Sequence, residues 1–77
     1  MTLKIISTED VVFEGEVTSV TLPGVMGLFT ILNNHASLVS TLSAGEVIYV
    51  SNGVESSNKI SGGIVDVDNN VVSVCIY

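Results

Sequence analysis

Cysteine, histidine, tryptophan and basic residues are almost absent from this sequence of 77 residues, and each shortage excludes a class of function. A single cysteine, Cys75, cannot form an internal disulfide, and it has no partner at the spacing of a zinc knuckle. A single histidine, His35, cannot build a metal site of clustered imidazoles. We therefore expect no metal ion and no disulfide, and the cysteine content favours a reducing compartment such as the cytoplasm.

The charge is strongly one-sided, with eight acidic residues against Lys4 and Lys59 and a net charge of −6. This charge repels the phosphates of nucleic acids and the head groups of anionic lipids, so we expect no nucleic-acid partner. The apolar start, residues 1–6, is followed at once by polar and acidic residues and is too short for a signal peptide or a membrane span. We expect no direct membrane insertion, so any membrane association depends on partner proteins.

A calcium loop is the nearest match among metal-binding motifs. Asp66, Asp68 and Asn70 fit its first three ligand positions, but Val71 replaces the required glycine and Tyr77 stands in place of the bidentate glutamate. These two departures exclude the motif.

Catalytic motifs fail for similar reasons. Glu14 and Glu16 share one face of a strand, as a carboxylate pair would, but no tryptophan is present to hold a sugar ring. No Gly-x-Ser-x-Gly elbow is present, and the glycines at 24–27 and 61–63 neither open a helix nor precede a lysine that could hold phosphate. The sequence therefore predicts a protein that is not an enzyme and needs no cofactor.

Helix-favouring residues are scarce, whereas valine, isoleucine and threonine occur in short runs separated by turn signals. This pattern predicts an all-β protein, and the length fits a single domain over residues 1–77. With 47% hydrophobic residues in so short a chain, part of the apolar surface is expected to meet a partner. The predicted strands are Leu3 to Ser7, Val11 to Phe13, Val17 to Leu22, Gly27 to Leu32, Ser37 to Leu42, Glu46 to Ser51, Val54 to Ile60, Ile64 to Val67 and Val71 to Tyr77.

Four connections between these strands have sequence signals. Asn52-Gly53 predicts a hairpin turn in which both residues adopt positive φ, and residues 68–70 predict a second hairpin. Pro23-Gly24 suits the two central positions of a type II turn, and Gly15 suits a tight bend between the second and third strands.

Alternation within the last hairpin predicts which side chains are buried. Val65 and Val67 are expected to face inward, as are the residues at 72, 74 and 76. Cys75 lies on the opposite face of the last strand and is interpreted as a small packing residue. Phe29 suits either the core or an exposed anchor, and its apolar neighbours favour the core.

One combination of segments is more specific than any of these fragments, and it resembles the N-terminal domain of the epsilon subunit of the F-type ATP synthase. The flanking segments fall in the family's order and spacing, so the resemblance covers nearly the whole chain. The segments that carry it are residues 3–7 (LKIIS), 12–17 (VFEGEV), 19–24 (SVTLPG), 27–32 (GLFTIL), 35–38 (HASL), Gly45, 61–63 (SGG), Val67 and 71–74 (VVSV).

The resemblance implies a flattened ten-stranded β-sandwich and a non-catalytic subunit of the central stalk, or rotor. Its partners would be the gamma subunit and the c-subunit ring, and it would help to deliver proton-driven rotation to the subunits that make ATP. It would lie peripherally at the cytoplasmic face of a bacterial plasma membrane. Carried over residue by residue, the ring-facing residues are Val25, Met26, Gly27, Leu28 and Phe29, and the gamma-facing residues, from the stretch 35–40, are His35, Val39 and Ser40.

Three departures from the family pattern qualify this expectation. Leu28 stands where many relatives have glutamate, so an apolar contact with the ring is expected there in place of an ion pair. Thr8 and Ser37 replace frequent prolines, which costs some local stiffness. The sequence ends at Tyr77, whereas full-length relatives continue into a helical domain that can inhibit hydrolysis and in some members binds ATP. A naturally short subunit and a shortened one remain open alternatives, and neither regulatory role is carried over.

Two other classes of protein remain to be weighed. A biotinyl or lipoyl carrier domain has this size, but it needs a lysine at a hairpin tip, and the best tip here is Asn52-Gly53, whereas Lys59 lies within a strand. An unrelated β-sandwich adaptor is the stronger alternative. The methionine start without a transit peptide favours a bacterial origin, with a plastid origin as the second choice, over a mitochondrial precursor.

Overall fold

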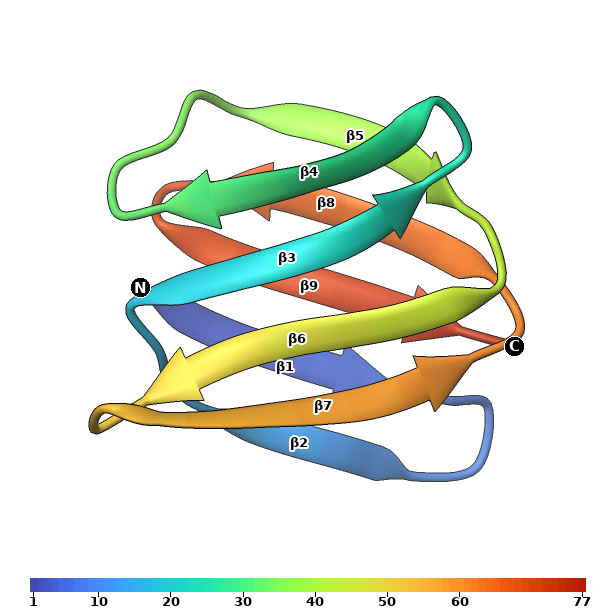
Figure 1. The fold of residues 1–77 in the computed structure, drawn as a ribbon, viewed down its shortest axis with the longest axis horizontal. Coiled ribbons are helices and arrows are strands. Elements are labelled where there is room, and N and C mark those ends of the chain that lie inside the picture. Colours follow the sequence, from blue (N-terminus) through green and yellow to red (C-terminus); the bar gives the residue numbers. More distant parts are fainter.

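The computed structural model describes all 77 residues, and it contains nine β-strands and no helix (Figure 1). It therefore has no long apolar helix of the kind that spans a bilayer. The strands are β1 (Thr2–Ile6), β2 (Val11–Glu16), β3 (Ser19–Gly24), β4 (Gly27–Leu32), β5 (Leu38–Leu42), β6 (Gly45–Ser51), β7 (Val54–Ile60), β8 (Gly63–Asp68) and β9 (Val71–Ile76).

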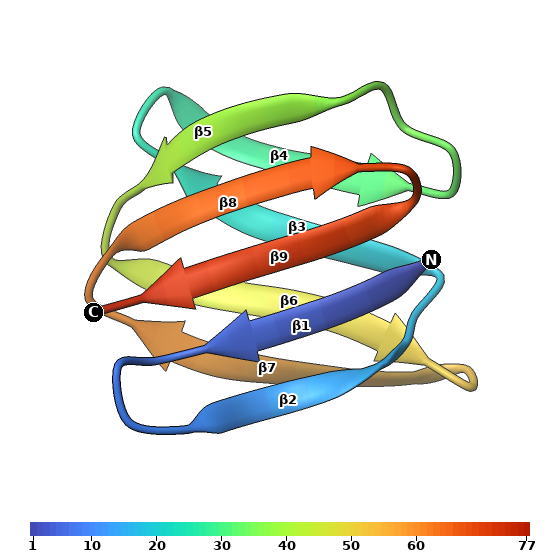
Figure 2. The ribbon, with the colours of Figure 1, turned by 180° about the vertical axis from the view of Figure 1, so that it is seen from behind.

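The strands form one continuous sheet that folds over into two layers. One layer has the order β2-β1-β9-β8-β5, and the other contains β4, β3, β6 and β7 (Figures 1 and 2). The layers are joined where β5 meets β3 at a single register pair, Gly24 with Leu42. All neighbouring strands are antiparallel except β1 and β9.

The predicted all-β class is confirmed, and only the number of strands differs. The resemblance implied ten strands, whereas the structure has nine. The alternating runs in the sequence also number nine, and each of them coincides with one strand of the structure to within two residues except at the end of the second, which extends to Glu16. Local alternation was therefore a better guide to strand number than the family pattern.

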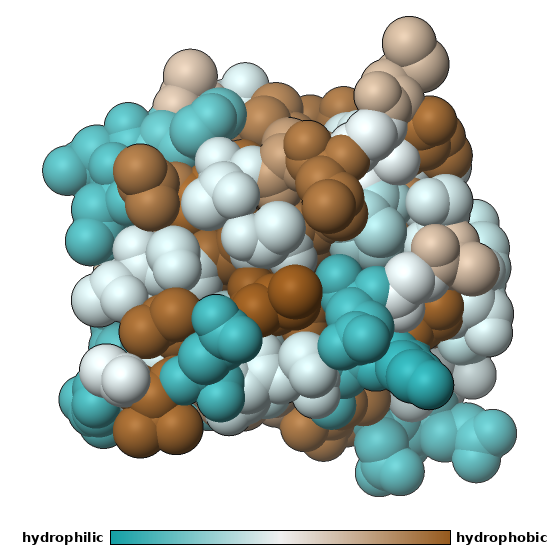
Figure 3. Space-filling model, viewed as in Figure 1, coloured by the Kyte–Doolittle hydropathy of each residue, from teal (hydrophilic) through white to brown (hydrophobic).

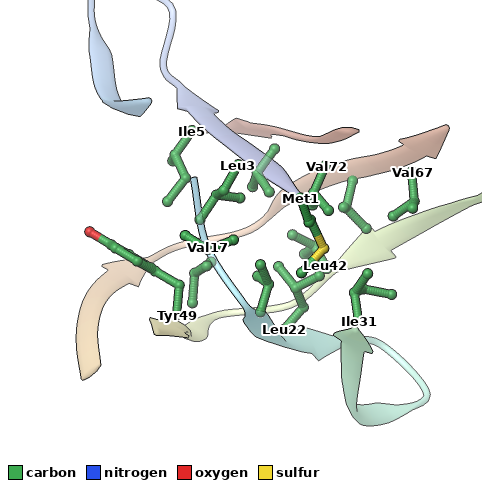
Figure 4. Close-up of a cluster of buried hydrophobic side chains, with 14 of the residues drawn as sticks. Met1, Leu3, Ile5, Val17, Leu22, Ile31, Leu42, Tyr49, Val67 and Val72 are labelled. Carbon is green, nitrogen blue, oxygen red and sulfur yellow. The ribbon is translucent and has the colours of Figure 1, made fainter. Parts of the chain in front are cut away.

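The core lies between the two layers and consists almost entirely of aliphatic side chains (Figure 4). Each strand that lines it alternates inward apolar residues with outward ones, and β8 is the clearest case, with Val65 and Val67 buried and Asp66 and Asp68 exposed. Of the predicted inward residues of β9, Val72 and Val74 have no exposed surface and Ile76 is half-buried against the core cluster. The remaining core residues are Met1, Leu3, Ile5, Val17, Val20, Leu22, Ile31, Leu42, Val47, Tyr49 and Ile60.

An aromatic pair connects the two layers near β2. The ring centroids of Phe13 in β2 and Tyr49 in β6 are 4.4 Å apart. Gly15 lies beneath this pair, because a Cβ atom there would sit 3.2 Å from Cζ of Phe13. The predicted bend at Gly15 is wrong: the residue lies inside β2, opposite Leu3, and its missing side chain leaves room for the ring.

Both predicted asparagine turns are confirmed. Asn52 and Gly53 have φ of 52° and 75°, as a two-residue hairpin turn of this kind requires. The β8–β9 turn is centred on Asn69 and Asn70, with φ of 50° and 62°. The packing role given to Cys75 is wrong, however, because its side chain is exposed on the outer face of β9.

Candidate docking surface

One continuous part of the chain contributes no charged side chain to the surface. Val17 to Gly45 contain no aspartate, glutamate, lysine or arginine, and they form β3, β4, β5 and their connections. Figure 3 shows apolar and pale, weakly polar side chains over the middle and upper right of this face. We call Val17 to Gly45 the uncharged side. Its exposed large apolar residues are Val25, Met26, Leu28, Leu32 and Val39.

The β3–β4 turn projects from one end of the uncharged side (Figure 1). Its two central residues are Val25 and Met26, and Met26 is 98% exposed. The type II turn predicted at Pro23-Gly24 is wrong, since both residues belong to β3 and the positive φ, 124°, is at Gly27. Gly24 is required for another reason: a Cβ atom there would lie 2.8 Å from the ring of Phe29.

The base of this turn is held by the end of β5 and by the segment that leads from β5 into β6. The backbone N–H of Val25 donates to the carbonyl oxygen of Thr41 at 3.2 Å. The backbone N–H and the hydroxyl of Ser43 both donate to the carbonyl oxygen of Pro23, at 2.8 Å and 3.2 Å. A turn anchored in this way loses little conformational entropy when a partner docks on it.

The five residues predicted to face the ring divide into two groups. Val25, Met26, Gly27 and Leu28 are exposed, and Leu28 is 75% exposed on the outer face of β4. Phe29 follows directly but points inward and packs against the core cluster. The structure therefore brings the first four together at the turn and places Phe29, half-buried, against the edge of the core.

The β4–β5 connection lies at the other end of β4 and contains His35. The His35 backbone N–H donates to the carbonyl oxygen of Leu32 at 3.2 Å, and the exposed imidazole Nδ1 lies 2.8 Å from the carbonyl oxygen of Ala36. The connection is also tied to the β8–β9 hairpin by two hydrogen bonds: the Asn34 N–H to Oδ1 of Asn70 and the Ser37 hydroxyl to Oδ1 of Asp68, both 2.8 Å.

The other two predicted gamma-facing residues point in opposite directions. Val39 and Ser40 are neighbours on β5, where Val39 is 71% exposed on the outer face and Ser40 is half-buried. A flat partner surface therefore reaches Val39 but not both side chains. His35 and Val39 remain the accessible members of this predicted group.

Two exposed apolar features of the structure were not predicted from the sequence. Leu32 is exposed on the same face of β4 as Leu28, and the alternation from Gly27 to Leu32 contained the signal for it. The second feature is an open apolar depression of about 310 Å³ at the ends of β1, β8 and β9. No local pattern indicated it, because its side chains come from three separated segments: Ile6, Ser7, Thr8, Ile64, Cys75, Ile76 and Tyr77.

The N-terminal ammonium group connects β2 to the β4–β5 connection. It donates to Oε2 of Glu16 at 3.1 Å and to Oδ1 of Asn33 at 3.0 Å. The other carboxylate oxygen of Glu16 accepts a hydrogen bond from the Thr2 hydroxyl at 2.8 Å. The hydrogen bond from Thr2, followed by the hydrogen bond and the positive charge of the N-terminal ammonium, holds the pKa of Glu16 below its usual value.

This lowered pKa predicts a pH-dependent stability difference between the wild-type chain and Glu16→Gln. A carboxylate whose pKa is depressed by folding stabilises the fold above its unfolded pKa and loses that effect as pH falls through the folded value. We expect Glu16→Gln to melt at a lower temperature than wild type at pH 7, with the gap closing below about pH 4, under the ordinary glutamate pKa of about 4.3. Thermal melts from pH 3 to pH 7 would measure it.

Glu14→Gln is the matched control, since Glu14 shares the exposed face of β2 but makes no hydrogen bond or ion pair with the N-terminus. A melting difference for Glu16→Gln that stays constant over the whole pH range would contradict the assignment.

A family model described as "ATP synthase, Delta/Epsilon chain, beta-sandwich domain" matches residues 1–76. The epsilon chain of the ATP synthase of Chlorobium limicola is 42% identical over 69 residues, which cover 88% of this chain and 78% of that protein. The epsilon chain from Leptospira borgpetersenii is 40% identical over 75 residues, covering 96% of this chain but 58% of the relative. The epsilon chain of Endomicrobium trichonymphae is 35% identical over 72 residues, which cover 94% of this chain and 52% of that protein. The chain thus spans little more than half the length of two of these three relatives.

Two solved assemblies contain chains with the same fold. A chain in the mitochondrial ATP synthase of Euglena gracilis, solved with its OSCP, F1 and c-ring, has a TM-score of 0.90 and 23% identity and covers 96% of this chain and 48% of that one. A chain in the central stalk and c-ring of the Tetrahymena thermophila mitochondrial ATP synthase has a TM-score of 0.81 and 16% identity, and the match covers 97% of this chain and 61% of that one. At these identities the likeness concerns the fold alone.

Proposed function

The chain belongs to the ATP synthase delta/epsilon chain family, and on that premise we propose that it is a non-catalytic subunit of the central stalk of an F-type ATP synthase. In this role it links the gamma subunit to the c-subunit ring and helps to deliver rotation driven by proton flow to the subunits that make ATP. The complex holds it peripherally at the cytoplasmic face of a bacterial plasma membrane. An unrelated adaptor is not supported, because the family match extends over residues 1–76.

The observation in the structure that best supports this proposal is the placement of two exposed patches at the two ends of β4. Val25, Met26 and Leu28 gather at the β3–β4 turn, and His35 lies in the connection that follows Leu32. A six-residue strand separates its ends by about 20 Å. A subunit that bridges two partners needs contact patches separated in this way, and the uncharged side provides both.

Co-expression with the gamma subunit of the same genome tests the proposal. We expect the two chains to co-purify as a stable one-to-one complex, with the mass measured by light scattering after size exclusion. Failure to co-purify, under conditions where circular dichroism shows both chains folded, would overturn the central-stalk assignment.

Leu28→Lys tests the proposed contact between the β3–β4 turn and the ring. A lysine ammonium at this position would have to lose water against an uncharged contact, so we expect at least about 10-fold weaker binding to membranes that carry the c-ring. Binding of the gamma complex to membranes stripped of their catalytic head measures the effect. Circular dichroism is expected to be unchanged, because the Leu28 side chain is 75% exposed.

Ser57→Lys is the control for that variant. Ser57 is exposed on β7, outside the uncharged side, so the same charge is added without touching the turn. Equal membrane binding by Leu28→Lys and Ser57→Lys would show that the β3–β4 turn does not carry the ring contact.

A further inference from the structure

The sheet has strand edges that pair with no other strand. β2 and β7 end the strand order, and β4 pairs with β3 alone. β5 also has an open edge, except where Leu42 meets Gly24 and where the carbonyl oxygen of Thr41 accepts the Val25 N–H. Open edges present unpaired N–H and C=O groups and readily pair with another chain, so proteins usually protect them with charged side chains or irregular pairing.

The edges at the lower end of both layers in Figure 1 have such protection. β2 carries Glu14 and Glu16, and its pairing with β1 contains a register shift between Ile5 and Ile6. β7 carries Glu55 and Lys59. Partner strands that approach β2 or β7 therefore meet charge along the edge.

The edge of β4 has none of these features. Its sequence, GLFTIL, contains no charged residue and no proline, and its pairing with β3 is regular over all six residues. It is also longer than the open part of β5. β4 is therefore the one long open edge in this fold that is left without protection.

The backbone groups exposed on this edge follow from the register. Gly24 and Gly27 flank a two-residue turn and form a hydrogen-bonded pair, after which paired and unpaired positions alternate along the hairpin. Leu28, Thr30 and Leu32 accordingly direct their backbone groups away from β3. Pro23 fits this pattern, since it lies opposite Leu28 at a position where no N–H is needed for the β3–β4 pair.

We propose that β4 is a strand-addition site, at which an extended partner segment with uncharged side chains pairs with the free backbone groups of Leu28, Thr30 and Leu32. Main-chain hydrogen bonds would supply binding energy, while the side chain of Leu32, exposed on the outer face of the strand, would select an apolar neighbour. Leu28 contributes only its backbone groups to this pairing, and its side chain stays with the ring-facing patch. A segment with charged side chains is disfavoured, because neither β4 nor the β3 strand it pairs with carries a countercharge.

The inference rests on the proposed function, because the gamma subunit is the partner with which it is tested. The connection that contains His35 begins where β4 ends. A gamma subunit docked on that connection is therefore well placed to pair one of its own strands with β4. The ring contacts remain possible in this arrangement, since Val25 and Met26 precede the strand and the Leu28 side chain leaves its outer face, not its edge.

Amide hydrogen exchange in the one-to-one gamma complex gives the direct readout. In the free chain the N–H groups of Leu28 and Thr30 have no strand partner and are expected to exchange rapidly. In the complex we expect their exchange to slow by at least about 100-fold, as new backbone hydrogen bonds form. Complex formation without slower exchange at these two amides would overturn strand addition while leaving the central-stalk role intact.

A pair of variants at Thr30 tests the same point by affinity. Thr30→Pro removes the edge-facing N–H, and proline is tolerated at such edge positions. Thr30→Val keeps the N–H, and both variants lose the hydroxyl contact with Thr21 at 2.9 Å. We expect at least about 10-fold weaker gamma binding for Thr30→Pro than for Thr30→Val. The reason is that Thr30→Pro removes about one hydrogen bond and leaves the acceptor group of the gamma segment buried without a donor.

Equal affinities of these two variants, both folded by circular dichroism, would overturn the inference. So would a dimer of the chain alone with the same amides protected, because the occupant would then be a second copy. If the unaltered chain binds no gamma subunit, the proposed function fails, and the inference fails with it.

Discussion

Phe29→Asp is expected to unfold the chain, whereas Leu28→Asp, one residue earlier, is expected to leave it folded. The two side chains leave β4 in opposite directions: Leu28 is 75% exposed, and Phe29 packs against the core cluster and against Gly24. Removing a fully buried phenylalanine costs about 3–5 kcal/mol; Phe29 is half-buried and loses part of that, and a carboxylate left against the core adds an uncompensated desolvation cost. A chain of 77 residues has a total stability of about 4–12 kcal/mol, so the first change removes most of it.

Urea unfolding followed by circular dichroism distinguishes the two variants. The expected result is a cooperative transition near the wild-type midpoint for Leu28→Asp and little or no folded baseline for Phe29→Asp. A folded Phe29→Asp protein with a wild-type midpoint would show that the ring is an exposed anchor. If Phe29→Asp unfolds the chain, a loss of binding in that variant says nothing about the contact with the c-subunit ring. Only variants at the exposed turn residues can test that contact.

The strands were predictable because their information is local. In β8, Val65 and Val67 alternate with Asp66 and Asp68, and this pattern alone fixes which face is buried. The turn at Asn52-Gly53 was equally predictable, because few residue pairs adopt positive φ twice in succession at low cost.

The glycines were misread because their roles depend on aromatic rings. Gly15 and Gly24 were interpreted as sites of backbone bending, but each makes room for a ring, that of Phe13 and that of Phe29. A glycine that adopts positive φ and a glycine that clears space for a side chain look the same in a sequence. Only the folded structure distinguishes them.

The candidate docking surface was only partly predictable. The exposure of Val25, Met26 and Leu28 was expected from the family resemblance, but the opposite orientations of Val39 and Ser40 follow from where β5 starts its alternation. Which strands lie at an edge depends on the strand order, and that order pairs segments far apart in the chain, such as β1 with β9. The unprotected edge of β4 therefore emerges only once the sheet is assembled.

Gly63→Ala is expected to destabilise the fold by at least about 3 kcal/mol, the upper range for overpacking, because no side chain can move to relieve the clash. Gly63 is buried at the start of β8 and pairs with Leu42 on one side and Ile76 on the other. A Cβ atom there would overlap the carbonyl oxygen of Cys75 and lie 3.2 Å from Cα of Ile76. All the obstructing atoms are backbone, so β8 and β9 would have to separate at this point.

Gly53→Ala separates this steric effect from the general cost of replacing a glycine. Gly53 has φ of 75°, and a Cβ atom added there would meet no other atom within 4 Å. Its replacement therefore costs only the backbone strain of about 1–2 kcal/mol. Chemical unfolding of both variants should place Gly63→Ala well below Gly53→Ala in stability. The reverse order would mean that β8 and β9 move apart easily at Gly63, and that the junction of β5, β8 and β9 is not a rigid part of the fold.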